Sequence, residues 1–190
     1  MKLAHVAAAA ALLLAGAASA QTQWNTGTGA NGHYYQFVST PVTAQDAFAG
    51  AAAMSYLGMP GYLVTITSAE ENSFVSSTIA NGQLAWLGGS DDGGPVNAWT
   101  WRVGPEAGQA FTYTSWGPGE PNDCCGGENY VHTNWAGVGG WNDHGGPGNA
   151  GQVNGYVVEF SAAPVPEPES WALMLAGLAV TGGWAARRRR

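Results

Sequence analysis

The first half of the chain alternates between strand-like and helix-like patterns of hydrophobic residues. Residues 33–39 (H-Y-Y-Q-F-V-S) and 62–67 (Y-L-V-T-I-T) are aromatic and β-branched runs that predict strands. Between them, apolar side chains follow Thr43 at helical spacing, which predicts a helix that begins there and ends near residues 58–61. A second helix is predicted from Ser68, because this Ser and Glu71 form a capping box, toward residues 81–82.

The second half consists of short apolar segments separated by long loops rich in Gly, Pro and Trp. A short buried strand is predicted at residues 85–89. Later apolar segments lie at residues 99–101, 111–116, 130–134 and 156–160. Because a strand, two helices and a strand precede these short segments, the element order is α+β.

Both ends of the chain have the pattern of processing signals. Residues 1–20 have a basic start, an apolar run and a small-residue cleavage pattern at Ala18-Ser19-Ala20, which predicts a secretory signal peptide. A buried Ala-rich helix is the alternative. Residues 162–190 contain V-P-E-P, an apolar run and four terminal arginines, which predicts membrane insertion with a cytoplasmic end. Residues 21–32 then form a flexible leader, and residues 33–161 form one domain.

Charge limits the partners of this domain. Between residues 21 and 163, eleven acidic side chains accompany a single basic one, Arg102, so the net charge is about −10. This balance argues against a nucleic-acid partner, because affinity for nucleic acid depends on Lys and Arg at the phosphates. Cations are the expected partners instead.

Oxygen-donor side chains gather in the loops of residues 116–143, without any Lys or Arg among them. Clustered carboxylates repel one another unless solvent or a metal separates them. Carboxylate and amide oxygens are the ligands of Ca²⁺, which takes about 6–8 of them. The spacing differs from that of a helix-loop-helix calcium loop. An acidic surface loop without a ligand is the alternative. The donors are Glu120, Asn122, Asp123, Glu128, Asn142 and Asp143.

Three motifs in these loops resemble, in their order and spacing, the sugar-binding calcium site of C-type lectin domains. They are E-P-N at 120–122, E-N at 128–129 and W-N-D at 141–143, and A-W-L-G-G at 85–89 is similar to a core segment of the family. The resemblance implies a C-type lectin-like fold, in which two helices flank small antiparallel sheets beside a long calcium-binding loop. It implies as Ca²⁺ ligands Glu120, Asn122, Glu128, Asn142 and Asp143.

The same resemblance implies how a sugar would bind. The carboxylates of Glu120 and Glu128 would accept hydrogen bonds from two sugar hydroxyls, and the amides of Asn122 and Asn142 would donate hydrogen bonds to them. The order E-P-N implies mannose- or glucose-type sugars. Trp135 is a candidate for a stacking platform.

Two features beside this site have open interpretations. The family implies an auxiliary calcium at Asp91, Asp92 and Asp123, whereas Asp91-Asp92-Gly-Gly also fits an ordinary turn. The two cysteines, Cys124 and Cys125, are adjacent, and an exported domain meets an oxidising compartment. A vicinal disulfide, free thiols and an intermolecular bridge are all consistent with the sequence.

The family also commonly has a disulfide whose positions we assigned to Tyr130 and Val158. The absence of cysteine at both positions predicts loss of that bridge, with apolar packing in its place.

The tail resembles the PEP-CTERM sorting signal of Gram-negative bacteria that make extracellular polysaccharide. The resemblance implies transient insertion in the inner membrane and removal of the tail by an exosortase, while a plain C-terminal anchor is the alternative. The domain would then be exported to the cell surface or the extracellular matrix.

Together these features predict a calcium-dependent, carbohydrate-binding protein that binds extracellular polysaccharide. The alternative is a calcium-stabilised lectin-like domain that binds a protein or a matrix component. An enzyme is not predicted, because no Ser-His-Asp arrangement or phosphate loop is recognised in the sequence. The spacing of Glu120 and Glu128 is explained by calcium ligation rather than by glycoside hydrolysis.

Overall fold

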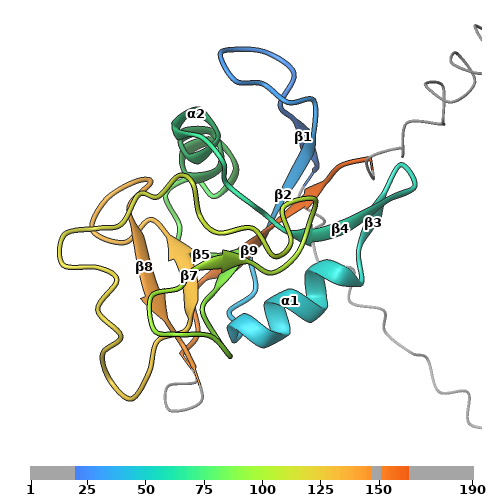
Figure 1. The fold of residues 1–190 in the computed structure, drawn as a ribbon. Helices are drawn as coiled ribbons and strands as arrows, with labels where there is room; N and C mark the ends of the chain where they lie inside the picture. The colour runs from blue at the N-terminus through green and yellow to red at the C-terminus, as the bar shows by residue number, and fades with distance from the viewer. Residues whose placement is uncertain (1–19, 147–150, 163–190) are drawn as a thin grey trace, which may run out of the picture.

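A single curved sheet with a helix on either side forms the molecule. The computed structural model describes residues 20–146 and 151–162 of the 190-residue chain. The strands of the main path are ordered β1-β2-β9-β5-β7-β8 (Figure 1). Outside this path, β4 pairs with β9 and with β3, and β6 pairs with β5. The strands are β1 Thr22–Gln23, β2 Tyr34–Val38, β3 Ser55–Tyr56, β4 Met59–Leu63, β5 Ala85–Ser90, β6 Thr100–Trp101, β7 Tyr130–Thr133, β8 Trp141–His144 and β9 Gly155–Phe160.

The first helix, α1 (Ala44–Ala52), begins where the sequence predicts. Thr43 is its N-cap, and its hydroxyl accepts a hydrogen bond from the Asp46 backbone N–H at 3.2 Å. The helix ends well before the predicted residues 58–61, and that prediction was wrong. Leu57 and Gly58 have φ values of 50° and 79°, and they form the tight turn that joins β3 to β4. This left-handed pair is favourable for a hairpin and incompatible with a helix.

The second helix begins at the predicted capping box and ends at Ile79, two residues before the predicted end at residues 81–82. The hydroxyl of Ser68 accepts from the Glu71 N–H at 3.1 Å, and the Glu71 carboxylate turns back to accept from the Thr67 N–H at 2.9 Å. Helix α2 (Ala69–Ser73) continues as a π-helical turn, η1 (Phe74–Ile79). Figure 1 shows α1 and α2 on opposite sides of the sheet.

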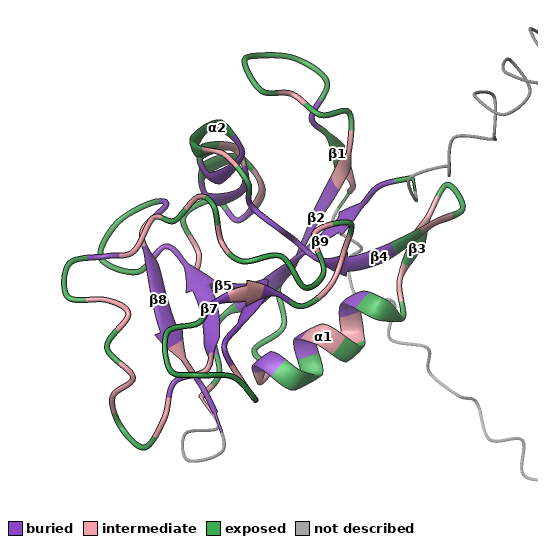
Figure 2. Cartoon of the chain, in the orientation of Figure 1, coloured by how far each residue is buried: buried purple, intermediate pink, exposed green. Residues whose placement is uncertain are grey.

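Each face of the sheet packs against one of the helices. Alternate side chains of a strand point to opposite faces, and β9 shows this clearly. Val157 lies in the core shared with η1, whereas Tyr156 and Val158 lie in the core shared with α1. Figure 2 shows the central strands buried along their whole length. The α+β prediction is therefore confirmed.

The sheet differs from the expected antiparallel arrangement in one pair of strands. Strand β9 runs parallel to β5, with Ala85 opposite Gly155 and Trp86 opposite Tyr156. Tyr130 and Val158 lie on β7 and β9, and β5 lies between these strands. Strands separated by another strand are about 10 Å apart, too far for a disulfide, so pairing these two positions as a lost bridge was wrong.

Some sequence predictions fall outside the part of the chain that the structure describes. Residues 1–19 and 163–190 contain nearly all of the predicted signal peptide and sorting tail. Within residues 20–146 and 151–162, no helix combines the length and apolar character needed to cross a membrane.

Candidate metal-binding site

The site begins with a strand at the edge of the sheet. Strand β8 carries Asn142 and Asp143, and it pairs with β7 so that Asn142 lies opposite His132. Its position is fixed by Trp141, which is fully buried among aromatic rings and donates its indole N–H to the Asn72 side-chain oxygen at 2.8 Å. The aromatic core thus places the two oxygen donors that follow Trp141.

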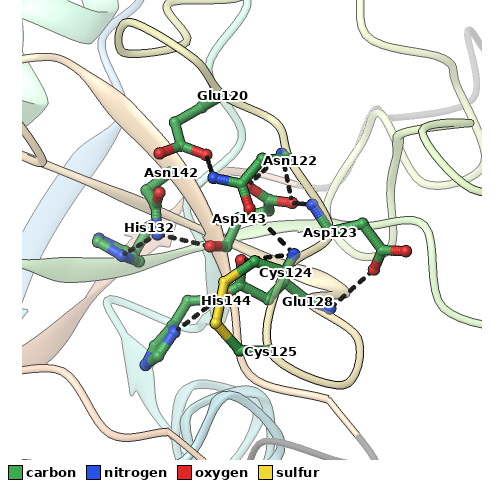
Figure 3. The surroundings of a disulfide bond; sticks show 10 residues. All are labelled: Glu120, Asn122, Asp123, Cys124, Cys125, Glu128, His132, Asn142, Asp143 and His144. Carbon is green, nitrogen blue, oxygen red and sulfur yellow. Dashed lines mark hydrogen bonds and ion pairs between the residues drawn. A yellow bond between two sulfur atoms is a disulfide. The ribbon is translucent and has the colours of Figure 1, made fainter.

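A loop about twenty residues earlier in the chain folds onto this strand. The carboxylate of Asp143, which is fully buried, accepts the Asn122 backbone N–H at 3.1 Å and the Asp123 N–H at 2.7 Å. The Glu120–Pro121 peptide bond is cis. Figure 3 shows Glu120, Asn122 and Asp143 close together, so donors from the loop and donors from β8 form one site.

Glu128 joins the site from the other end of the loop. Its side chain is only 4% exposed, and one carboxylate oxygen accepts from the Cys124 N–H at 3.2 Å. The other oxygen is 3.2 Å from Nδ1 of His144, whose ring stacks on Trp86. His144 is the last residue of β8 and lies beside the ligand set. No sequence pattern pointed to this contact, because it depends on how β7 and β8 pair.

A second histidine contacts the side chain of Asn142. His132 lies on strand β7, and its Nε2 is 3.2 Å from the Asn142 side-chain nitrogen. Burial lowers the pKa of His132 to about 4, so the imidazole is neutral near pH 7 and Nε2 accepts this hydrogen bond. This leaves the carbonyl oxygen of Asn142 available as a ligand.

Negative charge accumulates at the site without a compensating Lys or Arg. Burial, together with the nearby carboxylates of Asp143 and Glu128, raises the pKa of Glu120 above its usual value. In the described part of the chain, Arg102 is the single Lys or Arg, and the ion pairs found there involve histidines instead. The donor set of three carboxylates and two amides fits a hard, oxygen-preferring cation such as Ca²⁺.

The three carboxylates considered for an auxiliary calcium each accept hydrogen bonds from different groups of the protein. Asp91 accepts from the Asn97 N–H at 2.7 Å and from the Asn129 side chain at 3.0 Å, as in a closed turn. Asp92 accepts from the Tyr130 hydroxyl at 3.0 Å, and Asp123 accepts from the Glu128 N–H at 3.0 Å. The auxiliary site stays a prediction.

Asn129 is a residue whose role the sequence analysis missed. Its side chain holds the Asp91 turn, and its backbone N–H donates to the Gly145 carbonyl at 2.7 Å. It therefore connects the loop that carries Glu120, Asn122 and Glu128 both to the preceding loop and to the end of β8. Its place directly after Glu128, in the E-N motif, was the available clue.

Two further candidates lie beside the ligand set. Trp135 is 45% exposed and meets the ring of His132 edge-on, with 6.2 Å between ring centroids. Cys124 and Cys125 form a disulfide with each other, one of the three states left open by the sequence. Their sulfur atoms lie within 4.8 Å of a Glu128 carboxylate oxygen, but disulfide sulfurs are not thiolates and make poor metal ligands.

Comparison with known proteins gives the same fold. The chain is similar to the C-type lectin CEL-I from Cucumaria echinata, with 24% identity, a TM-score of 0.58, and coverage of 74% of this chain and 96% of that one. It is also similar to the cow C-type carbohydrate-recognition domain of CD23, whose crystal structure was determined in the presence of a GlcNAc2Man3 oligosaccharide. The identity is 27%, the TM-score 0.53, and the coverage 69% and 90%.

Sequence comparison adds one relative and one motif. The chain is similar to halomucin from Haloquadratum walsbyi, with 36% identity in an alignment of 144 residues that covers 70% of this chain and only 2% of that protein. Residues 164–190 match the PEP-CTERM protein-sorting motif. The chain thus combines a C-type lectin-like fold with a C-terminal PEP-CTERM motif.

Proposed function

We propose that this C-type lectin-like protein binds a mannose- or glucose-type sugar through Ca²⁺ at the site built from Glu120, Asn122, Glu128, Asn142 and Asp143. The observation that carries the proposal is the convergence of three carboxylates and two amides from a loop and a strand, held together by the Asp143 carboxylate. The raised pKa of Glu120 supports it, because a bound cation would offset this crowding of negative charge.

Four of the five ligand residues also have a role toward the sugar. Bound calcium would supply positive charge and open coordination positions for two neighbouring hydroxyls. The carboxylates of Glu120 and Glu128 accept hydrogen bonds from the sugar hydroxyls, and the side-chain N–H groups of Asn122 and Asn142 donate hydrogen bonds to the hydroxyl oxygens. The exposed Trp135 offers an apolar face beside these groups.

The proposed ligand in the cell is an extracellular polysaccharide. The PEP-CTERM motif indicates export to the surface or beyond, and we propose that residues 1–20 are a signal peptide and that an exosortase processes the tail. Since a single shallow site binds weakly, many displayed copies on one polymer would supply avidity.

Isothermal titration calorimetry with methyl mannoside and methyl glucoside, in calcium and in excess chelator, tests this function. We expect sugar binding in calcium that disappears with the chelator. The matched variant Glu120→Gln/Asn122→Asp keeps the charge and size of the pair but reverses its order. We expect it to retain calcium binding and to lose mannose and glucose binding. Sugar binding that persists in chelator would contradict the proposal, and calcium binding without any sugar response would favour a domain that binds protein or matrix.

A further inference from the structure

The disulfide between Cys124 and Cys125 lies inside the span that connects two proposed calcium ligands. Asn122 precedes it and Glu128 follows it, and the sulfur atoms lie within 4.8 Å of a Glu128 carboxylate oxygen (Figure 3). Cys124 is half-buried and Cys125 is exposed. Because the cysteines are adjacent, the bond closes a small ring that includes their shared peptide bond, and the ring restricts the backbone of both.

One backbone group within this unit contacts both ligands. The N–H of Cys124 lies 2.9 Å from the Asn122 side-chain oxygen and 3.2 Å from a carboxylate oxygen of Glu128. The orientation of this single N–H therefore links the two side chains, which come from opposite ends of the loop. A change in the backbone at Cys124 would move both of them.

The rest of the span offers little stiffness of its own. Gly126 and Gly127 follow the disulfide with φ values of 100° and 110°, and glycine gains the most backbone freedom when it is released. Cys125 itself has φ of 62°, in the left-handed region that a residue with a Cβ rarely adopts. The covalent ring opposes the relaxation of this residue toward more favourable backbone angles.

We propose that the Cys124–Cys125 disulfide is a positioning element that holds Asn122 and Glu128 ready for calcium, so that its reduction weakens calcium binding. This inference rests on the calcium site of the proposed function. Reduction by a dithiol transfers two electrons and two protons to the S–S bond and yields two thiols, while the reductant becomes a disulfide. If calcium must order about one more residue of backbone when it binds the reduced chain, the entropy cost corresponds to about a tenfold weaker calcium affinity.

The test compares calcium titrations of the oxidised chain and of the chain reduced with dithiothreitol, by calorimetry in oxygen-free buffer after removal of the reductant. We expect the dissociation constant to rise about tenfold on reduction and to recover on reoxidation. The variant Cys124→Ser/Cys125→Ser should bind calcium like the reduced chain, and reductant should not change its affinity.

A second readout separates positioning from general stability. In chelator, amide hydrogen exchange of residues 119–128 should be faster in the reduced chain, while exchange in the strands and the melting temperature should change little. Equal calcium affinity of the oxidised and reduced chains would overturn this inference alone. If reduction also lowered the melting temperature in chelator, the disulfide would stabilise the whole fold, and this inference would be overturned. No calcium binding by either chain would overturn the proposed function and this inference together.

Discussion

Replacement of Asp143 by Asn isolates the group that joins the loop to the strand. The side chain is fully buried, and its two oxygens accept the backbone N–H groups of Asn122 and Asp123 at 3.1 Å and 2.7 Å. Asn has nearly the same shape but retains only one acceptor oxygen. The remaining oxygen can take the place of Oδ2, which accepts both backbone N–H groups. The change therefore removes one charged ligand of the proposed calcium, the second acceptor of the Asn122 N–H, and the negative charge that strengthens both hydrogen bonds.

The size of the effect follows from the number and type of these contacts. A hydrogen bond to a charged group contributes about 1.5–3 kcal/mol. Without metal, the loss of stability from these weakened hydrogen bonds is partly offset, because the neutral amide of the variant would no longer repel the carboxylates of Glu120 and Glu128. We expect the metal-free variant to be about 1–2 kcal/mol less stable, which is about 3–6 °C in melting temperature for a chain of this size. Calcium affinity should fall about 100-fold, equivalent to about 2.7 kcal/mol.

Calorimetric calcium titration and thermal melting in chelator measure the two effects separately. The control is Asp46→Asn, which makes the same chemical change at an exposed residue near the start of α1, where the carboxylate contacts the Thr43 hydroxyl at 2.9 Å. This control should keep full calcium affinity and change stability by about 0.5 kcal/mol or less. Wild-type calcium affinity in Asp143→Asn, or an equal loss in the control, would refute this assignment of the site.

Three other outcomes are expected. Saturation with calcium at about 100 times its dissociation constant should stabilise the protein by about 2.7 kcal/mol, so addition of chelator should lower the melting temperature; an unchanged melting curve would contradict metal binding. Trp141→Phe should destabilise the protein by about 2–3 kcal/mol in urea unfolding, because it leaves the buried Asn72 oxygen without its donor; a loss below about 0.5 kcal/mol would show that this bond does not anchor β8. The hydrogen bond from His33 to Glu159, 2.6 Å long, raises the pKa of His33. This stabilisation is present below about pH 6.5 and is lost as pH rises through the raised pKa, so wild-type stability should fall about 1 kcal/mol more than that of His33→Gln between about pH 6 and pH 8. An equal change in unfolding free energy for the two proteins over this pH range, measured by urea unfolding, would contradict the ion pair.

Local sequence patterns predicted the starts of the helices and the strand at residues 85–89 because each depends on nearby residues. Thr43 and Ser68 cap helices through contacts with backbone N–H groups three residues ahead. The early end of α1 was missed because apolar periodicity continues past Ala52. The left-handed pair at Leu57-Gly58, with the pairing of β3 and β4, stops the helix instead.

The site was predicted as a set of residue types but not as an arrangement. The motifs E-P-N, E-N and W-N-D identified the donors, yet the Asp143 contact with the loop forms only when segments about twenty residues apart meet. The role of His144 depends on the pairing of β8 with β7, which places its ring over Trp86 and beside Glu128. Likewise, the sequence left the state of the two cysteines open, because their bonding depends on loop conformation.

A crystal structure determined with calcium and methyl mannoside tests the central claim most directly. The account predicts one calcium ion bound by side-chain oxygens of the five ligand residues (Glu120, Asn122, Glu128, Asn142 and Asp143), with two neighbouring sugar hydroxyls completing its coordination. An ion bound elsewhere, such as at Asp91 alone, or a sugar bound away from the ion, would contradict it.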